Sequence, residues 1–191
     1  MMLAHYHGQV WNASELARAF GVAHTTVQRY LDILTETFMV RQLQSWHENI
    51  GKRQVRAPKV YIRDSGLLHA LLALETPRAI ESHPKVGASW EGFGLDVVVS
   101  RLQARPEECF FWATHSGAEL DLLVVRGGLR LGFEFKRTTT PAVTRSMRVA
   151  MADLRVTEIA VIHAGSRSYR LDRNIRAIAL DRIRDDLHPL R

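Results

Sequence analysis

Three carboxylates and a lysine interrupt two strongly apolar runs in the middle of the chain. The segment from residue 118 to residue 137 reads AELDLLVVRGGLRLGFEFKR, and these four residues are Glu119, Asp121, Glu134 and Lys136. Carboxylate oxygens are the ligands that Mg²⁺ prefers in proteins. Two clustered carboxylates here would therefore hold a divalent cation, provided that the backbone brings them together.

The Gly127-Gly128 pair predicts that this segment is a β-hairpin. A two-residue type I′ turn needs positive φ at both central positions, which glycine adopts freely. With these glycines as the loop, Asp121 lies opposite Glu134, and Glu119 lies opposite Lys136. Strand alternation then places all four charged side chains on one face. The opposite face is predicted to carry Leu120, Leu122, Val124, Phe133 and Phe135.

An Asp, twelve intervening residues and then Glu-x-Lys on a hairpin resemble the PD-(D/E)XK nuclease superfamily. The resemblance covers about residues 84–180, although Leu120 stands where the proline of the superfamily's name would be. It implies phosphodiester hydrolysis with Mg²⁺ or Mn²⁺ bound by Asp121 and Glu134 and by the Phe135 carbonyl. Lys136 would orient or deprotonate water, or neutralise charge on the phosphate. Glu91, on the helix before the hairpin, would bind the metal or orient its water shell.

Two of these acidic residues also have simpler interpretations. Glu91 could be a solvated helix residue. Glu119 opposite Lys136 could form a cross-strand ion pair worth a few tenths of a kcal/mol to about 1 kcal/mol. Such a pair would either hold Lys136 in place or occupy it.

The first part of the chain has the pattern of a winged helix. The sequence predicts helices at about residues 14–20 and 24–37, separated by a turn at Gly21, with Ser14 or Asn12 as the first N-cap. A strand at 39–46, a polar basic loop and a strand at 59–64 follow. The buried stripes are predicted to be Leu16, Ala17 and Phe20 in the first helix, and Val27, Tyr30, Leu31 and Leu34 in the second. The opening MMLAHYHGQVW leaves little room for a preceding helix, which indicates a shortened chain or a split gene.

A helix-turn-helix reads DNA with the N-terminal residues of its second helix, and wing residues contact phosphates. The candidate nucleic-acid-binding residues are Thr25, Thr26, Gln28 and Arg29 in the helix, and Lys52, Arg53 and Arg56 in the wing. Winged helices also serve as protein-contact modules, and polar outward residues occur on any solvated helix. DNA contact and protein contact therefore both stay open at this point.

The remainder is predicted to contain a helix at 66–74, a linker with two prolines, and a long helix from residue 86. Strands at 109–114, 118–125 and 129–136, a helix at 143–154, and strands at 158–163 and 176–180 complete an αβββαβ order with one further strand. The layout KVYIRDSGLLHALL, GASWEGFGLDVVVSRL, ELDLLV and FEFKR resembles the DUF4143 family. That family implies the C-terminal region of a protein whose N-terminal half is an AAA-type P-loop ATPase. No Walker A motif is present here, since IGKR at 50–53 lacks its upstream Gly and its Ser/Thr.

The bulk composition narrows the protein class. A formal charge of +6 over 191 residues favours a polyanionic partner, although a merely soluble basic surface has the same charge. Cys109 is the only cysteine, so no intrachain disulfide can form and a reducing cytoplasm is expected. No apolar run approaches the length of a membrane span. Nine histidines form no convincing ligand set, and a zinc site is not expected.

The sequence thus predicts an α/β (α+β) chain with a winged helix and linker at 1–80 and a restriction-endonuclease-like domain at 81–191. The expected function is Mg²⁺-dependent cleavage of nucleic acid. Because the Walker A motif is absent, this chain alone is not expected to bind ATP. The alternative is a catalytically silent module that binds nucleic acid, preferably DNA, or protein and regulates an attached or separate P-loop ATPase.

Overall fold

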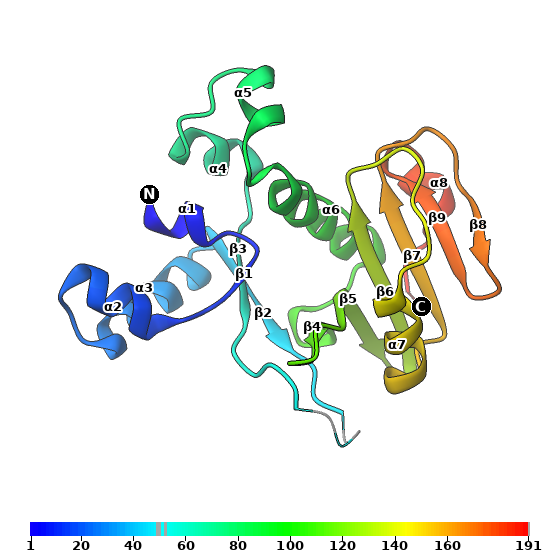
Figure 1. Cartoon of the computed structure of the whole chain (residues 1–191), viewed down its shortest axis with the longest axis horizontal. Coiled ribbons are helices and arrows are strands. Elements are labelled where there is room, and N and C mark those ends of the chain that lie inside the picture. Colours follow the sequence, from blue (N-terminus) through cyan, green and yellow to red (C-terminus); the bar gives the residue numbers. More distant parts are fainter. Residues whose placement is uncertain (49–50, 52, 191) are drawn as a thin grey trace. The chain divides into compact units, whose positions relative to one another are not determined.

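The computed structural model describes residues 1–48, 51 and 53–190, and it combines helices with mixed β-sheet, so the chain is an α/β protein (Figure 1). Its backbone contacts define two compact units. The first comprises Met1–Leu43 and Ala57–Gly92, and the second comprises Gln44–Arg56 and Phe93–Arg191. The sequence-based division at residues 80 and 81 differs from this one in two places, because residues 44–56 are counted with the second unit and residues 81–92 with the first.

The first unit contains a short antiparallel sheet and small helices. Its sheet has the order β1-β3-β2, in which β1 is Gln9–Val10, β3 is Lys59–Ile62, and β2 is Val40–Ser45. Its helices are α1 (Met2–Tyr6), α2 (Ala13–Phe20), α3 (His24–Glu36), α4 (Ser65–Leu71) and α5 (Pro77–Ser82). The Asn12 side chain accepts the Glu15 N–H at the start of α2, and Gly21 ends that helix with φ of 67°. Both helix-boundary predictions are confirmed.

The buried stripe of α3 is narrower than predicted. Val27 and Leu31 are buried, but Tyr30 is 56% exposed, and Phe20 of α2 is 51% exposed. Leu34 of α3 is exposed as well, so the prediction that Tyr30, Leu34 and Phe20 face inward is wrong. A small unit of short helices buries one seam of each, so large apolar residues beside the seam stay at the surface.

Two helices of the first unit were not predicted. The opening residues form α1, where little room for a helix was expected. Pro77 lies at the first position of α5, where its missing N–H costs nothing, and the Thr76 side chain caps the helix by accepting the Ala79 N–H. The proline that indicated a linker therefore starts a helix.

The second unit is built around a mixed sheet. The order is Gln44 and Ser45 of β2, then β4-β5-β6-β7-β9-β8, and β6, β7 and β9 are mutually parallel. Its strands are β4 (Cys109–Ala113), β5 (Glu119–Arg126), β6 (Leu129–Lys136), β7 (Glu158–His163), β8 (Tyr169–Asp172) and β9 (Ile175–Ala179). The order α6 (Val86–Leu102), β4, β5, β6, α7 (Arg145–Leu154), β7 is the predicted αβββαβ order. Strand β8, the short helix α8 (Ile183–Asp186) and the 3-10 turns at Pro106–Glu108 and Leu180–Arg182 were not predicted.

Helices α6 and α7 pack on opposite faces of β6. Met147 and Leu154 of α7 share an apolar cluster with Leu123 of β5, which pairs with Gly132 of β6. Phe135 of β6 instead approaches Gly94 of α6, where an added Cβ would lie 2.6 Å from the phenyl ring. The pairing of β6 with β7 has no register shift, so successive residues of β6 point to alternate faces of the sheet. Residues 132 and 135 are three positions apart and therefore point to opposite faces. A glycine in α6 therefore permits close packing on the strand that carries Glu134 and Lys136.

Candidate active site on the central hairpin

The hairpin has the predicted register over most of its length. Arg126 pairs with Leu129, and the ladder continues without a shift to the pair formed by Leu122 and Phe133. Gly127 and Gly128 have φ of 55° and 88°, as a type I′ turn requires. The register prediction is therefore confirmed as far as Leu122, one residue before Asp121.

A β-bulge changes the geometry at the site itself. Between β4 and β5, Phe110 pairs with Leu123 and Trp112 pairs with Leu120, so β5 has one extra residue over this interval. Bulges bend a strand and redirect its side chains, and they are frequent beside active sites. Because Asp121 lies inside the bulged interval, its position depends on this irregularity as well as on the hairpin turn.

Because of the bulge, the predicted apolar face of the hairpin is wrong at Leu120. Leu120 belongs to the same buried cluster as Leu123, although simple alternation would place them on opposite faces. The Asp121 carboxylate accepts a hydrogen bond from the Phe135 N–H, with 3.0 Å between Oδ2 and the nitrogen. Asp121 Oδ2 thus accepts a backbone hydrogen bond at the end of the hairpin ladder, and this bond fixes the orientation of the carboxylate.

Both carboxylates converge on Lys136. Its Nζ lies 2.7 Å from Glu134 Oε2 and 3.6 Å from Asp121 Oδ2. The two carboxylate side chains are only 3% and 4% exposed, whereas the lysine is 38% exposed. Lys136 therefore compensates two buried acids from the mouth of the site, in addition to any contact with Glu119.

The environment favours a proton on Glu134. Burial, and next the Asp121 charge, raise the pKa of Glu134 to about 8, while Lys136 acts in the opposite direction. Glu119 contributes a smaller upward effect. The raised pKa follows from placing two acids in a water-poor site with a single nearby cation. Near neutral pH the pair thus holds a proton in the absence of another cation.

One carboxylate oxygen of this site accepts no hydrogen bond. Glu134 Oε1 is buried and has no hydrogen-bond partner within the described part of the chain. Such an orphan, beside a second buried carboxylate, fits the donor set of a divalent cation with oxygen ligands. Among the residues that the structure describes, however, no group of three His, Cys, Asp or Glu side chains is placed to hold a metal ion.

Glu91 lies in the first compact unit and is held there by two neighbours from β3. The Tyr61 hydroxyl donates to Glu91 Oε1 at 2.5 Å, and Lys59 Nζ lies 3.4 Å from the same oxygen. The Glu91 side chain is 18% exposed, so the interpretation as a solvated helix residue does not hold. The metal-binding role implied for Glu91 stays a prediction.

The candidate DNA-reading residues differ in their accessibility. Thr25 and Arg29 of α3 are exposed, and Thr26 is half-buried. Gln28 accepts from the Trp11 indole N–H at 3.0 Å and donates to Asp32 at 2.9 Å. Gln28 is therefore engaged within the first unit.

The predicted wing is anchored to β4 of the second unit. Gln54 accepts from the Trp112 indole N–H at 3.0 Å, and the Arg53 carbonyl accepts the His115 N–H at 2.9 Å. Trp46 packs edge-on against Phe110 with 5.0 Å between ring centroids. The side chains of Arg53 and Arg56 are exposed, and Lys52 lies outside the described residues. The arginines are thus carried on a segment whose backbone is tied to a sheet edge.

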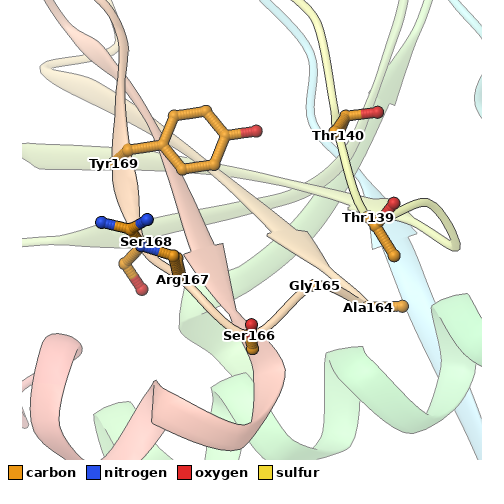
Figure 2. Close-up of a pocket in the computed structure, with 8 residues that line it drawn as sticks. All are labelled: Thr139, Thr140, Ala164, Gly165, Ser166, Arg167, Ser168 and Tyr169. Carbon is orange, nitrogen blue, oxygen red and sulfur yellow. The ribbon is translucent and has the colours of Figure 1, made fainter.

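The sequence analysis did not single out the loops that follow β6 and β7. In register, Lys136 pairs with His163, the last residue of β7, and the chain continues as Ala164-Gly165-Ser166-Arg167-Ser168. Figure 2 shows these residues lining a pocket with Thr139, Thr140 and Tyr169. A Gly/Ser-rich turn after a buried parallel strand was the available sequence signal.

Two family profiles match successive parts of the chain. The profile of DUF8612, a domain of unknown function, matches residues 1–78, and the profile of DUF4143, also a domain of unknown function, matches residues 86–183. The DUF4143 match thus covers the hairpin and α6 but not the predicted winged helix. No helix in the described part of the chain is long and apolar enough to cross a membrane.

Two curated relatives extend the similarity over nearly the whole chain. They are the uncharacterized proteins Mb2031c of Mycobacterium bovis and Rv2008c of Mycobacterium tuberculosis, each 50% identical over 182 residues. The match covers 95% of this chain but only 41% of each relative. No solved structure matches the chain. The family profile over residues 86–183 places the chain in the DUF4143 family.

Proposed function

We propose that the second unit is a metal-dependent phosphodiesterase that cleaves nucleic acid. The observation that supports this most directly is the pair of buried carboxylates, Asp121 and Glu134, converging on one lysine with Glu134 Oε1 left without a partner. A buried acid pair is costly unless a cation compensates it. The PD-(D/E)XK resemblance gives the same residues a role in phosphodiester hydrolysis.

Each residue of the cluster has a separate task in this proposal. Asp121 and Glu134 would hold Mg²⁺ or Mn²⁺, together with the Phe135 carbonyl. The bound ion would polarise the phosphate and lower the pKa of attacking water. The Phe135 N–H keeps the Asp121 carboxylate oriented. Lys136, the most exposed member, would turn toward the phosphate and neutralise its developing charge.

The proton on Glu134 couples this site to pH. A carboxylate must be deprotonated to bind a cation, and the pKa of Glu134 is raised to about 8 by burial and by Asp121. Cation binding near pH 7 is therefore expected to release a proton. Cleavage should increase from pH 6 to pH 8, as the metal competes more easily with that proton.

The test is a cleavage assay with matched variants. Plasmid, linear duplex and single-stranded DNA, and single-stranded RNA, are incubated with about 10 mM Mg²⁺, Mn²⁺ or Ca²⁺, or with EDTA. Asp121→Asn and Lys136→Met should each remove cleavage in Mg²⁺ and Mn²⁺. Glu75→Gln, a change at an exposed acid, serves as the control and should leave it unchanged. Cleavage that persists in Asp121→Asn would assign the activity to a contaminant.

A second candidate function is favoured by one feature of the same site. Lys136 already contacts both carboxylates, and a third acidic, His or Cys ligand is not placed beside them in the described residues. A catalytically silent unit that binds nucleic acid or protein, and that regulates a P-loop ATPase, would need no more than this. Binding without cleavage under every ionic condition above would favour this candidate.

The first unit is proposed to be a winged helix that contacts DNA. Its element order α1, β1, α2, α3, β2, β3 suits that fold, and Thr25 and Arg29 are accessible on α3. Replacing Arg29 with Ala should weaken DNA binding and reduce its salt dependence. Arg53→Ala and Arg56→Ala test separately whether the predicted wing, which belongs to the second unit, contacts DNA. Unchanged affinity in Arg29→Ala would assign the first unit to protein contacts.

A further inference from the structure

The pocket at the carboxyl ends of β6 and β7 is separate from the carboxylate cluster but close to it along the chain. Its volume is about 640 Å³. Thr139 follows Lys136 by three residues, which span at most about 11 Å. Open α/β sheets commonly bind ligands outside the carboxyl ends of their strands. The location therefore suits a substrate subsite.

A buried histidine holds the floor of this pocket in one shape. His163 is fully buried, its Nδ1 lies 3.1 Å from the Gly165 nitrogen, and its Nε2 lies 3.1 Å from the Arg167 carbonyl oxygen. The Gly165 N–H can only donate and the carbonyl can only accept, so Nδ1 accepts the first hydrogen bond and Nε2 donates the second. Both ring nitrogens are thus used to fix the loop after β7.

The two loops that form the pocket are also fastened to each other. The Ala164 N–H donates to the Thr138 carbonyl at 3.0 Å. At Gly165, an added Cβ would lie 2.7 Å from the Thr139 carbonyl oxygen, so only glycine allows this approach. A cavity with fixed walls loses little entropy when a ligand binds. The pocket is therefore preformed.

The lining chemistry combines one cation, several hydroxyls and one aromatic ring. In Figure 2, Tyr169 and Arg167 lie on one side of the pocket, Thr139 and Thr140 on the other, and Ser166 below. The Tyr169 ring is accessible, since the residue is 40% exposed. None of the described lining residues carries a carboxylate. These groups match a single nucleotide, with a phosphate for the guanidinium, a sugar for the hydroxyls and a base for the ring.

We propose that this pocket binds one nucleotide of a single-stranded nucleic acid, next to the phosphodiester that the carboxylate cluster cuts. The proposal rests on the function proposed above for Asp121 and Glu134. Arg167 contacts the phosphate, the base stacks on Tyr169, and the Thr139 and Thr140 hydroxyls contact the sugar from the opposite side of the pocket. A free mononucleotide presents the same chemistry, and the experiment separates the two sources.

The test measures binding without cleavage. The affinity of the full chain for a fluorescent 12-nucleotide oligo(dT) is followed by anisotropy in EDTA, with dTMP as a competitor. Tyr169→Ala should weaken binding about tenfold, in the range for loss of one base–aromatic stack, and Tyr169→Phe should restore it. Arg167→Ala should weaken binding and reduce the slope of log affinity against log salt by about 1.

The control is Arg173→Ala, which removes the same charge from an exposed position outside the pocket lining. Equal losses in Arg167→Ala and Arg173→Ala, or no effect of Tyr169→Ala, would overturn the proposal. Binding of dTMP as tight as that of the oligonucleotide would overturn it in favour of a free nucleotide. Circular dichroism and melting temperature establish that each variant folds.

The two proposals fail in different ways. Tyr169-dependent binding by a chain that cleaves nothing in Mg²⁺ or Mn²⁺ would reject the phosphodiesterase and keep the nucleotide site. Cleavage of single strands with an unchanged KM in Tyr169→Ala would keep the phosphodiesterase and reject the nucleotide site.

Discussion

Replacing Glu134 with Gln should make the stability of the chain less dependent on pH. Glutamine keeps the size of the side chain and removes its charge. Burial, and next the Asp121 charge, raise the pKa of Glu134 from 4.5 to about 8. The folded chain therefore binds this proton more tightly than the unfolded chain. The resulting stabilisation is complete below about pH 4.5 and is lost as the pH rises to about 8.

The size of the effect follows from the shift. Each pKa unit corresponds to about 1.36 kcal/mol, so the full loss between pH 4.5 and pH 9 approaches about 5 kcal/mol. The attraction of Lys136 is already part of this shift, because it acts against burial and the Asp121 charge. Glu134→Gln should therefore gain about 4 kcal/mol relative to the wild type between pH 5 and pH 9.

Urea denaturation followed by circular dichroism, in EDTA and at one-unit steps from pH 5 to pH 9, measures this difference. The control is Glu75→Gln, whose exposed side chain should give a difference near zero at every pH. If the difference between wild type and Glu134→Gln were constant from pH 5 to pH 9, Glu134 would not release a proton in this range, and the reasoning about the buried pair would be refuted.

Three further outcomes are expected. About 10 mM Mn²⁺ or Mg²⁺ should raise the melting temperature by a few degrees, since a site with Kd near 1 mM contributes about 1.4 kcal/mol. Asp121→Asn should abolish this shift, and a fluorimetric melt measures both. Gly94→Ala should cost about 1 to 3 kcal/mol in urea denaturation, because the new Cβ meets the Phe135 ring, whereas Gly87→Ala in open space on the same helix should be neutral or stabilising. Burial lowers the pKa of His7 to about 4, so its NMR resonances should stay those of a neutral ring down to pH 5. The stability that the neutral ring contributes is lost as the pH falls from 6.5 to 4. A titration midpoint near 6.5 would contradict the burial of His7.

Local signals predicted the central hairpin well. The Gly127-Gly128 turn and the alternation of the flanking strands gave the register, and the bounds of β6 and β7 are those expected. The nearness of Asp121 to Glu134 depends on that register and on the bulge that contains Asp121. These features depend on residues within one hairpin, where the turn geometry determines the pairing.

The remaining parts of the site depend on contacts between distant segments. The bulge around Asp121 arises from the pairing of β5 with β4, and the run ELDLL contains no local mark of it. The attachment of Gln54 to Trp112 joins residues 58 positions apart. The pocket floor depends on a buried His163, and a lone histidine at the end of a strand gives no such indication. Sequence periodicity reports burial within one element and not the partner that causes it.

The interleaving of the two compact units limits how this chain can be rearranged during evolution. Gln44 and Ser45 pair with β4, while the preceding residues of the same strand pair with β3. A recombination breakpoint near residue 80 would separate the two family matches neatly in the gene. It would also remove from the second unit the segment that covers the outer edge of β4. Gene fusions that exchange one unit alone should therefore be selected against, and the two units should be inherited as a single module.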